Sequence, residues 1–104
     1  MPMTVKTALR RDGVLQTLRE SGSLFRTFGV SRVSLFGSFA RDEARDDSDV
    51  DVLVEFNRPI GLFEFVRLRR ELSQRVGREI DLVTTAALKP QLRDRILLEA
   101  VVAA

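Results

Sequence analysis

LFGSFAR at residues 35–41 and SDVDVLV at residues 48–54 are the two stretches of the sequence that decide its fold. The first closes a segment rich in Val, Leu and Phe that stops at a Gly-Ser pair, which is typical of a strand ending in a turn. In the second, apolar residues occupy every other position, and this period of two is that of a strand with one buried face. The sequence therefore predicts strands at residues 32–36 and 50–56.

Helices and one more strand are predicted around these two strands. Apolar residues at helical spacing predict two helical pieces within residues 4–28, one or two turns at 39–44 and an amphipathic helix at 62–76. Residues 79–83 have the composition of a third strand. Pro90 suits the first turn of a last helix. The residues of this helix that we expect to face inward are Leu92, Ile96, Leu97, Ala100 and Val101. The order predicts an α/β (α+β) domain, with helices on one face of a short mixed sheet.

Length and composition restrict the class of protein. A chain of 104 residues predicts a single domain over residues 1–104. The chain has no cysteine and no histidine, so disulfides, thiolate metal sites and the commonest general base are excluded. Chemistry must depend on carboxylates, hydroxyls and Lys or Arg, and carboxylates favour hard ions such as Mg²⁺. No apolar run approaches the roughly 20 residues of a membrane span. A cytoplasmic protein is expected.

The charge of the chain is unevenly distributed. Residues 42–51 hold six acidic residues and one Arg, although the whole chain has a net charge of +2. The remainder is therefore basic and would suit an anionic partner such as nucleic acid. The arginines are scattered rather than clustered, which is also the pattern of an ordinary solvated surface. Direct nucleic-acid binding stays open but is not favoured.

Two acidic residues and a Gly-Ser pair form the candidate site. Asp49 and Asp51 are two positions apart on a predicted strand and point to one face, where their charges repel unless a cation or a proton lies between them. Carboxylates are also common on half-exposed strands without any function. Gly37 and Ser38 end a strand and open a helical turn, and such a turn can hold phosphate oxygens. Gly-Ser followed after ten residues by Asp-x-Asp is more specific than either motif alone.

These motifs resemble the nucleotidyltransferase superfamily related to DNA polymerase β, and most of all its smallest members, the minimal nucleotidyltransferases. The similarity continues in Gly61-Leu62-Phe63, in Glu79–Val83 and, less specifically, in Leu92–Ile96 and Glu99–Val101. It covers nearly the whole chain from Phe28. The resemblance implies a polymerase β-like nucleotidyltransferase fold and a metal-dependent nucleotidyltransferase activity.

The resemblance also implies which carboxylates take part in catalysis. Asp49 and Asp51 would bind Mg²⁺ on a nucleotide triphosphate, and Asp81 on the third strand would join them in binding a second ion. The position of Asp81 agrees with this, because Ile80 and Leu82 are expected to face the core and Asp81 therefore the other side. A solvated acid on a strand is the alternative for Asp81 alone.

Gly37, Ser38 and Arg41 would bind the triphosphate of ATP in the resembled family. Arg41 could instead only pair with Asp42 or Glu43 at the surface, a contact worth about 0–1 kcal/mol. Relatives usually carry Gly at the position of Asp42, and the aspartate places a negative charge near the nucleotide end of the site.

The resemblance extends to a partner. Minimal nucleotidyltransferases are usually antitoxins of the MntA type, which transfer AMP from ATP to a tyrosine of a HEPN-type RNase toxin. It therefore implies a protein adenylyltransferase with a HEPN toxin as its partner. Two alternatives stay open. The chain could neutralise a toxin by binding alone, which the three retained carboxylates argue against. It could also modify a small molecule or RNA, which the many arginines keep open.

Overall fold

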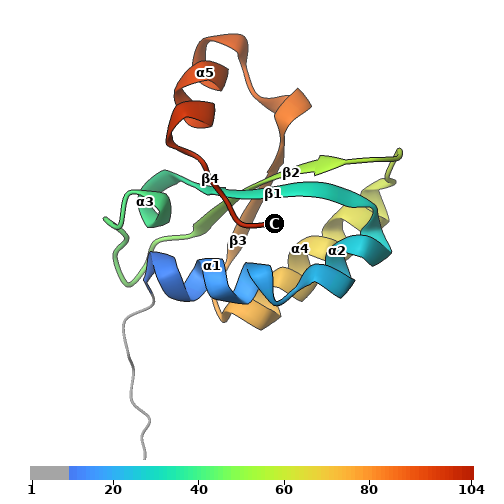
Figure 1. The fold of residues 1–104 in the computed structure, drawn as a ribbon, viewed down its shortest axis with the longest axis horizontal. Coiled ribbons are helices and arrows are strands. Elements are labelled where there is room, and N and C mark those ends of the chain that lie inside the picture. Colours follow the sequence, from blue (N-terminus) through green and yellow to red (C-terminus); the bar gives the residue numbers. More distant parts are fainter. Residues whose placement is uncertain (1–9) are drawn as a thin grey trace, which may run out of the picture.

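The structure is a computed structural model that describes residues 10–104. Its elements, in chain order, are α1 (Arg11–Arg19), α2 (Gly22–Phe28), β1 (Val30–Phe36), α3 (Gly37–Ala40), β2 (Val50–Phe56), α4 (Leu62–Val76), β3 (Ile80–Thr84), the 3-10 helix η1 (Thr85–Ala87), α5 (Pro90–Glu99) and β4 (Val101–Val102). Figure 1 shows how the helices lie around the strands. Within residues 10–104, no helix is long and apolar enough to cross a membrane.

The strands form one mixed sheet in the order β3-β2-β1-β4. β1 is antiparallel to β2 and to β4, whereas β2 and β3 are parallel. In this register Phe36 lies opposite Asp51, and Asp51 lies opposite Asp81. The end of β1 and the beginnings of β2 and β3 therefore meet at one end of the sheet. The predicted mixed sheet is confirmed.

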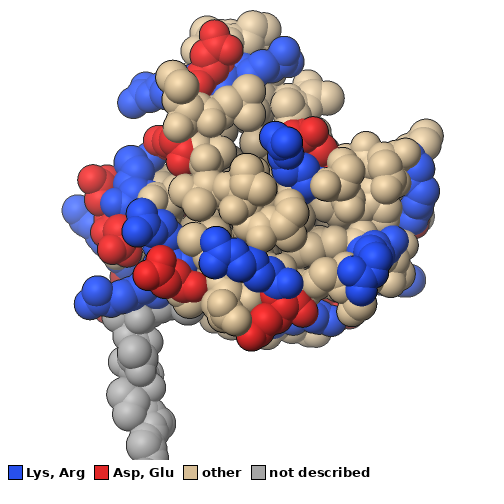
Figure 2. All heavy atoms as spheres, viewed as in Figure 1, with Lys and Arg blue, Asp and Glu red and all other residues tan. Residues whose placement is uncertain are grey.

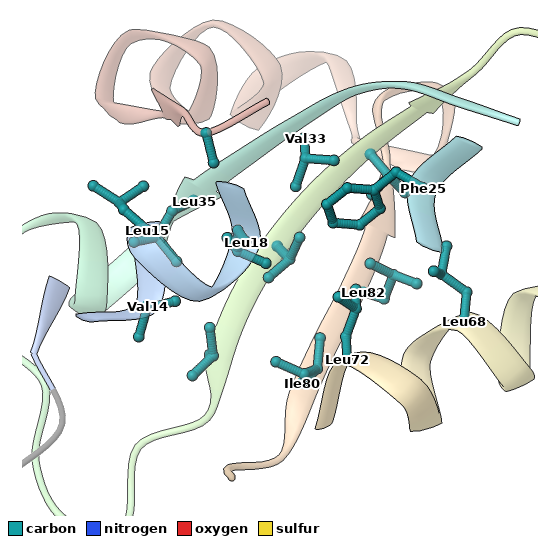
Figure 3. Close-up of a cluster of buried hydrophobic side chains, with 14 of the residues drawn as sticks. Val14, Leu15, Leu18, Phe25, Val33, Leu35, Leu68, Leu72, Ile80 and Leu82 are labelled. Carbon is teal, nitrogen blue, oxygen red and sulfur yellow. The ribbon is translucent and has the colours of Figure 1, made fainter. Parts of the chain in front are cut away.

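The main core lies between the sheet and the helices α1, α2 and α4, which cover one of its faces (Figure 1). Figure 3 shows apolar side chains of these helices meeting those of the strands. Leu18, Leu68 and Leu72 are fully buried there, and burial of one such side chain contributes about 1.5–3 kcal/mol. The strand residues in this core are Val33, Leu35, Val50, Val52, Val54, Ile80 and Leu82. The predicted alternation of β2 and β3 is thus confirmed on this face.

α5 lies on the other side of β1 and β2 from these three helices (Figure 1) and contains no buried residue. Leu92 and Leu97 are 43% and 44% exposed, so the expectation that they face inward is wrong. The apolar residues of α5 are spread around the helix and form no single stripe that could be buried. Val101 is partly buried against the core, but it belongs to β4 and not to the helix.

The predicted bounds agree with the structure for β2 and α4 and are close elsewhere. β1 begins two residues earlier than predicted, β3 is displaced by one residue, and α3 is a single turn that begins at Gly37. α1 and α2 occupy the described part of the predicted helical segment 4–28, and residues 4–9 lie outside the described residues. The two-residue strand β4 was not predicted.

Candidate active site

Three of the predicted site residues lie at the beginnings of β2 and β3. Asp51 is the second residue of β2 and directly faces Asp81, the second residue of β3. Asp49 immediately precedes β2. Asp49 and Asp81 are exposed, whereas Asp51 is half-buried between its two neighbouring strands. The parallel register thus brings two of the three predicted carboxylates side by side, and the third is two residues away along the chain.

The electrostatics of this end of the sheet are set by its like charges. Burial above all, and then the negative charges of Asp81 and Asp49, raise the pKa of Asp51 from an ordinary value of 3.8 to about 6. The positive charge of Arg41 opposes this shift. Burial and the neighbouring carboxylates disfavour the ionised form of Asp51. A cation bound beside it would stabilise that ionised form.

Gly37 lies against the Asp51 carboxylate, and no other residue fits this position. Its φ angle is +74°, which is in the left-handed region that favours glycine. A Cβ on Gly37 would also overlap the Asp51 carboxylate oxygen Oδ2. The Gly-Ser pair therefore begins where β1 ends, in contact with the Asp-x-Asp motif, and Ser38 follows half-buried in α3. The two motifs that the sequence separates by ten residues are adjacent in space.

The donor atoms at this site suit a hard cation. Only carboxylate oxygens are offered, which is the ligand type that Mg²⁺ prefers, and the missing Cβ of Gly37 leaves the space that the Asp51 carboxylate occupies. Among residues 10–104, no three acidic side chains are arranged as a complete metal site. An ion bound at this site would therefore need further oxygens besides those of Asp49, Asp51 and Asp81, such as those of substrate phosphates.

Arg41 lies next to the Gly-Ser turn and is held by two carboxylates. Its Nε donates to Glu43 at 3.0 Å, and its Nη1 donates to Glu99 at 3.1 Å. These hydrogen bonds, the one to Glu43 first, raise the pKa of Arg41 above its ordinary value. The Glu43 pair is one of the surface contacts considered from the sequence. Glu99 was not foreseen as part of the site, because nothing in the sequence links it to Arg41, 58 residues away.

Asp42 has a φ angle of +59° and is the one residue other than glycine with a positive φ in the described chain, residues 10–104. Its backbone N–H donates to the carbonyl of Phe39 at 3.1 Å, which closes the turn after α3. Such a conformation costs an ordinary residue about 1–2 kcal/mol and glycine almost nothing. This explains in physical terms why a glycine suits this position.

A separate hollow lies at the opposite end of the sheet. It has a volume of about 370 Å³ and is lined mainly by apolar groups, including Val54, Phe56, Ile60 and Ala86. None of the predicted site residues borders it. Its position at the ends of β2 and β3 places it away from the carboxylates, which lie at the beginnings of the same strands.

Comparison with known proteins identifies the family. A model of the nucleotidyltransferase domain matches residues 14–103. A candidate protein adenylyltransferase of Methanocaldococcus jannaschii is 49% identical over 73 residues, which are 70% of this chain and 78% of that protein. The protein adenylyltransferase MntA of Thermococcus cleftensis is 40% identical over 74 residues, which are 71% of this chain and 75% of that protein. The chain belongs to the nucleotidyltransferase domain family and is an enzyme of that class.

Solved structures show the same fold. The structure of a candidate minimal nucleotidyltransferase has a TM-score of 0.80 and 35% identity, and the match covers 92% of this chain and 98% of that one. An MNT antitoxin in complex with a tri-AMPylated HEPN toxin of Shewanella oneidensis has a TM-score of 0.65 and 16% identity, over 88% of this chain and 71% of that one. The second match shows a common fold only. The predicted minimal nucleotidyltransferase fold is confirmed.

We expect Asp51→Asn to raise the melting temperature of the metal-free protein at pH 8 and to leave it unchanged below pH 4. The carboxyl has a raised pKa in the folded state, so the unfolded chain ionises first as the pH rises. The wild type therefore loses stability between about pH 4 and pH 6, and the uncharged amide avoids that loss. Thermal denaturation in a chelator from pH 3.5 to pH 8 measures the difference. Asp49→Asn, at an exposed position, is the control, and its melting temperature should rise less. A rise in the melting temperature of Asp51→Asn that is the same at every pH would contradict the prediction.

We expect Asp42→Gly to stabilise the fold by about 0.5–1 kcal/mol, because glycine adopts the positive φ of this turn without strain. Urea denaturation of the two proteins measures the change in the free energy of unfolding. Asp42→Ala is the matched control, since it removes the same charge but keeps a Cβ. Equal stabilisation by both variants would show that charge and not backbone conformation decides the effect.

Proposed function

We propose that the chain transfers AMP from ATP to a hydroxyl group of a partner protein, a tyrosine of a HEPN-type RNase toxin, and thereby acts as an antitoxin. The observation that carries the proposal is the contact between the Gly-Ser turn and the Asp-x-Asp strand, with Asp81 beside Asp51. Relatives named as protein adenylyltransferases, at 49% and 40% identity, support protein as the acceptor. The shared fold with an antitoxin bound to an AMPylated HEPN toxin supports the partner.

The chemistry follows from the positions of the side chains. Asp49 and Asp51 would hold a Mg²⁺ ion on the triphosphate, and Asp81 would join them in holding a second ion toward the acceptor. Bound metal neutralises phosphate charge and lowers the pKa of the acceptor hydroxyl, which matters in a chain without histidine. Gly37, Ser38 and Arg41 would hold the phosphates that leave.

The transfer itself exchanges one bond to phosphorus for another. The acceptor oxygen loses its proton and attacks the α-phosphorus of ATP, the bond to the bridging oxygen breaks, and pyrophosphate leaves. AMP is then linked to the acceptor through a phosphodiester. Positioning and charge stabilisation by the carboxylates and by the Gly-Ser turn would supply most of the catalysis.

The face of the molecule drawn in Figure 2 gives no support to RNA as the acceptor. Figure 2 shows Lys and Arg side chains spread over the visible face, with Asp and Glu among them. Several arginines are already paired with acids, as in the contacts Arg41–Glu43 and Arg58–Glu64. A single basic groove would be expected of a protein whose main partner is nucleic acid, and this face has none.

The test is AMP transfer by the double variant Asp49→Asn, Asp51→Asn. Incubation with labelled ATP, Mg²⁺ and the toxin encoded by the neighbouring gene should label the toxin when the wild type is present. The double variant should lose at least about 100-fold in rate, because it removes two charges from the centre of the reaction. It should remain folded, since both side chains point away from the buried valines.

Asp46→Asn, Asp47→Asn is the matched control, because it removes two exposed acids from the loop before the site. This control should label the toxin at the wild-type rate. In a growth assay with co-expressed toxin, the wild type and the control should protect cells, whereas the site variant should not. Full protection by the folded site variant at matched expression would show that the chain acts by binding and would refute the enzymatic proposal.

A further inference from the structure

Glu99 makes contacts that the proposed chemistry does not use. It is the last residue of α5, and its side chain is 27% exposed. Its Oε1 accepts a hydrogen bond from the backbone N–H of Gly37 at 3.2 Å. The same carboxylate accepts from Nη1 of Arg41 at 3.1 and 3.2 Å. One anionic group thus binds two of the three residues assigned to the triphosphate.

The Glu99 carboxylate occupies hydrogen-bond donors that a phosphate group would also use. Carboxylate and phosphate oxygens are both anionic acceptors and use the same donors, namely backbone N–H groups and guanidinium groups. The N–H of Gly37 has a single proton, so it cannot serve Glu99 and a phosphate oxygen fully at the same time. Glu43, the other carboxylate bound to Arg41, takes no backbone donor from the Gly-Ser turn and uses a different nitrogen of the guanidinium.

We propose that Glu99 is a built-in competitor of the nucleotide, whose carboxylate occupies the Gly37 N–H and Arg41 until the triphosphate displaces it. This inference rests on the proposed assignment of Gly37 and Arg41 to the triphosphate. The inference makes Glu99 a residue that sets nucleotide affinity. Glu99 lies 62 residues from Gly37 in the sequence.

The surroundings of Glu99 allow it to move at little cost. α5 buries no residue in the core, and Leu98, next to Glu99, is 88% exposed. The chain beyond Glu99 is fixed to β1, where Val101 lies opposite Leu35, and Ala103 N–H donates to the carbonyl of Val33 at 2.8 Å. Release of the Glu99 side chain would therefore break an exposed ion pair and one hydrogen bond and leave both the core and the sheet intact.

The experiment compares the affinity of the full chain for ATP with Mg²⁺, measured by calorimetry, in the wild type and in Glu99→Gln. The amide keeps the length of the side chain and removes its charge. We expect Glu99→Gln to bind ATP about 3- to 10-fold more tightly, as expected for loss of a competing charged contact. Inorganic tripolyphosphate, which has the phosphates but no nucleoside, should show the same ratio, whereas adenosine should show no change.

Glu43→Gln is the matched control, because it removes one carboxylate from Arg41 without freeing the Gly37 N–H. It should change ATP affinity by less than about 2-fold, in keeping with an exposed pair. Weaker or unchanged binding by Glu99→Gln would overturn the proposal and would make Glu99 a residue that only positions Arg41. Equal gains in ATP affinity in both variants would overturn the proposal too, because the loss of one negative charge near Arg41 would then explain both gains.

The experiment also separates this inference from the proposed function. If ATP binds as expected but no protein is modified, the AMP-transfer proposal fails and the role of Glu99 stands. If neither the wild type nor Glu99→Gln binds ATP or tripolyphosphate, the assignment of the Gly-Ser turn to phosphate is wrong, and the inference falls with it.

Discussion

The contact on which the site depends is that between the Asp51 carboxylate, Gly37 and Asp81 at one end of the sheet. Parallel pairing of β2 with β3 sets Asp51 opposite Asp81, and Val50 and Val52 on the buried face fix that register. Their burial holds two acids together that repel each other. The partial burial of Asp51 and, after it, the charge of Asp81 raise the pKa of Asp51 to about 6. The fold thus maintains an arrangement that is unfavourable by itself and that a cation would relieve.

Much of the fold and part of the site could be predicted from local patterns in the sequence. β2 was predicted because its valines alternate with other residues, and α4 because its leucines recur at helical spacing. The orientation of Asp81 followed from its buried neighbours on the same strand. The resemblance to nucleotidyltransferases joined these local patterns into one site. That Gly37 touches Asp51 explains physically why the two motifs occur together.

The features of the fold and the site that local sequence patterns do not predict depend on contacts between distant parts of the chain. Glu99 meets Gly37 only because β4 returns the C-terminal end beside β1, and a two-residue strand is too short to show any period. The exposure of α5 was missed for a different reason. Its leucines and isoleucine have the composition of a buried helix, but they are distributed around its axis, so only the packed structure shows which side is covered.

The most direct test of the site is diffraction from crystals grown with Mn²⁺ and a non-hydrolysable ATP analogue, with anomalous scattering used to locate the metal. We expect a Mn²⁺ peak within coordinating distance of Asp49 and Asp51, and the phosphates of the analogue against Gly37, Ser38 and Arg41. A nucleotide in the apolar hollow at the opposite end of the sheet, or a metal bound away from these carboxylates, would contradict it.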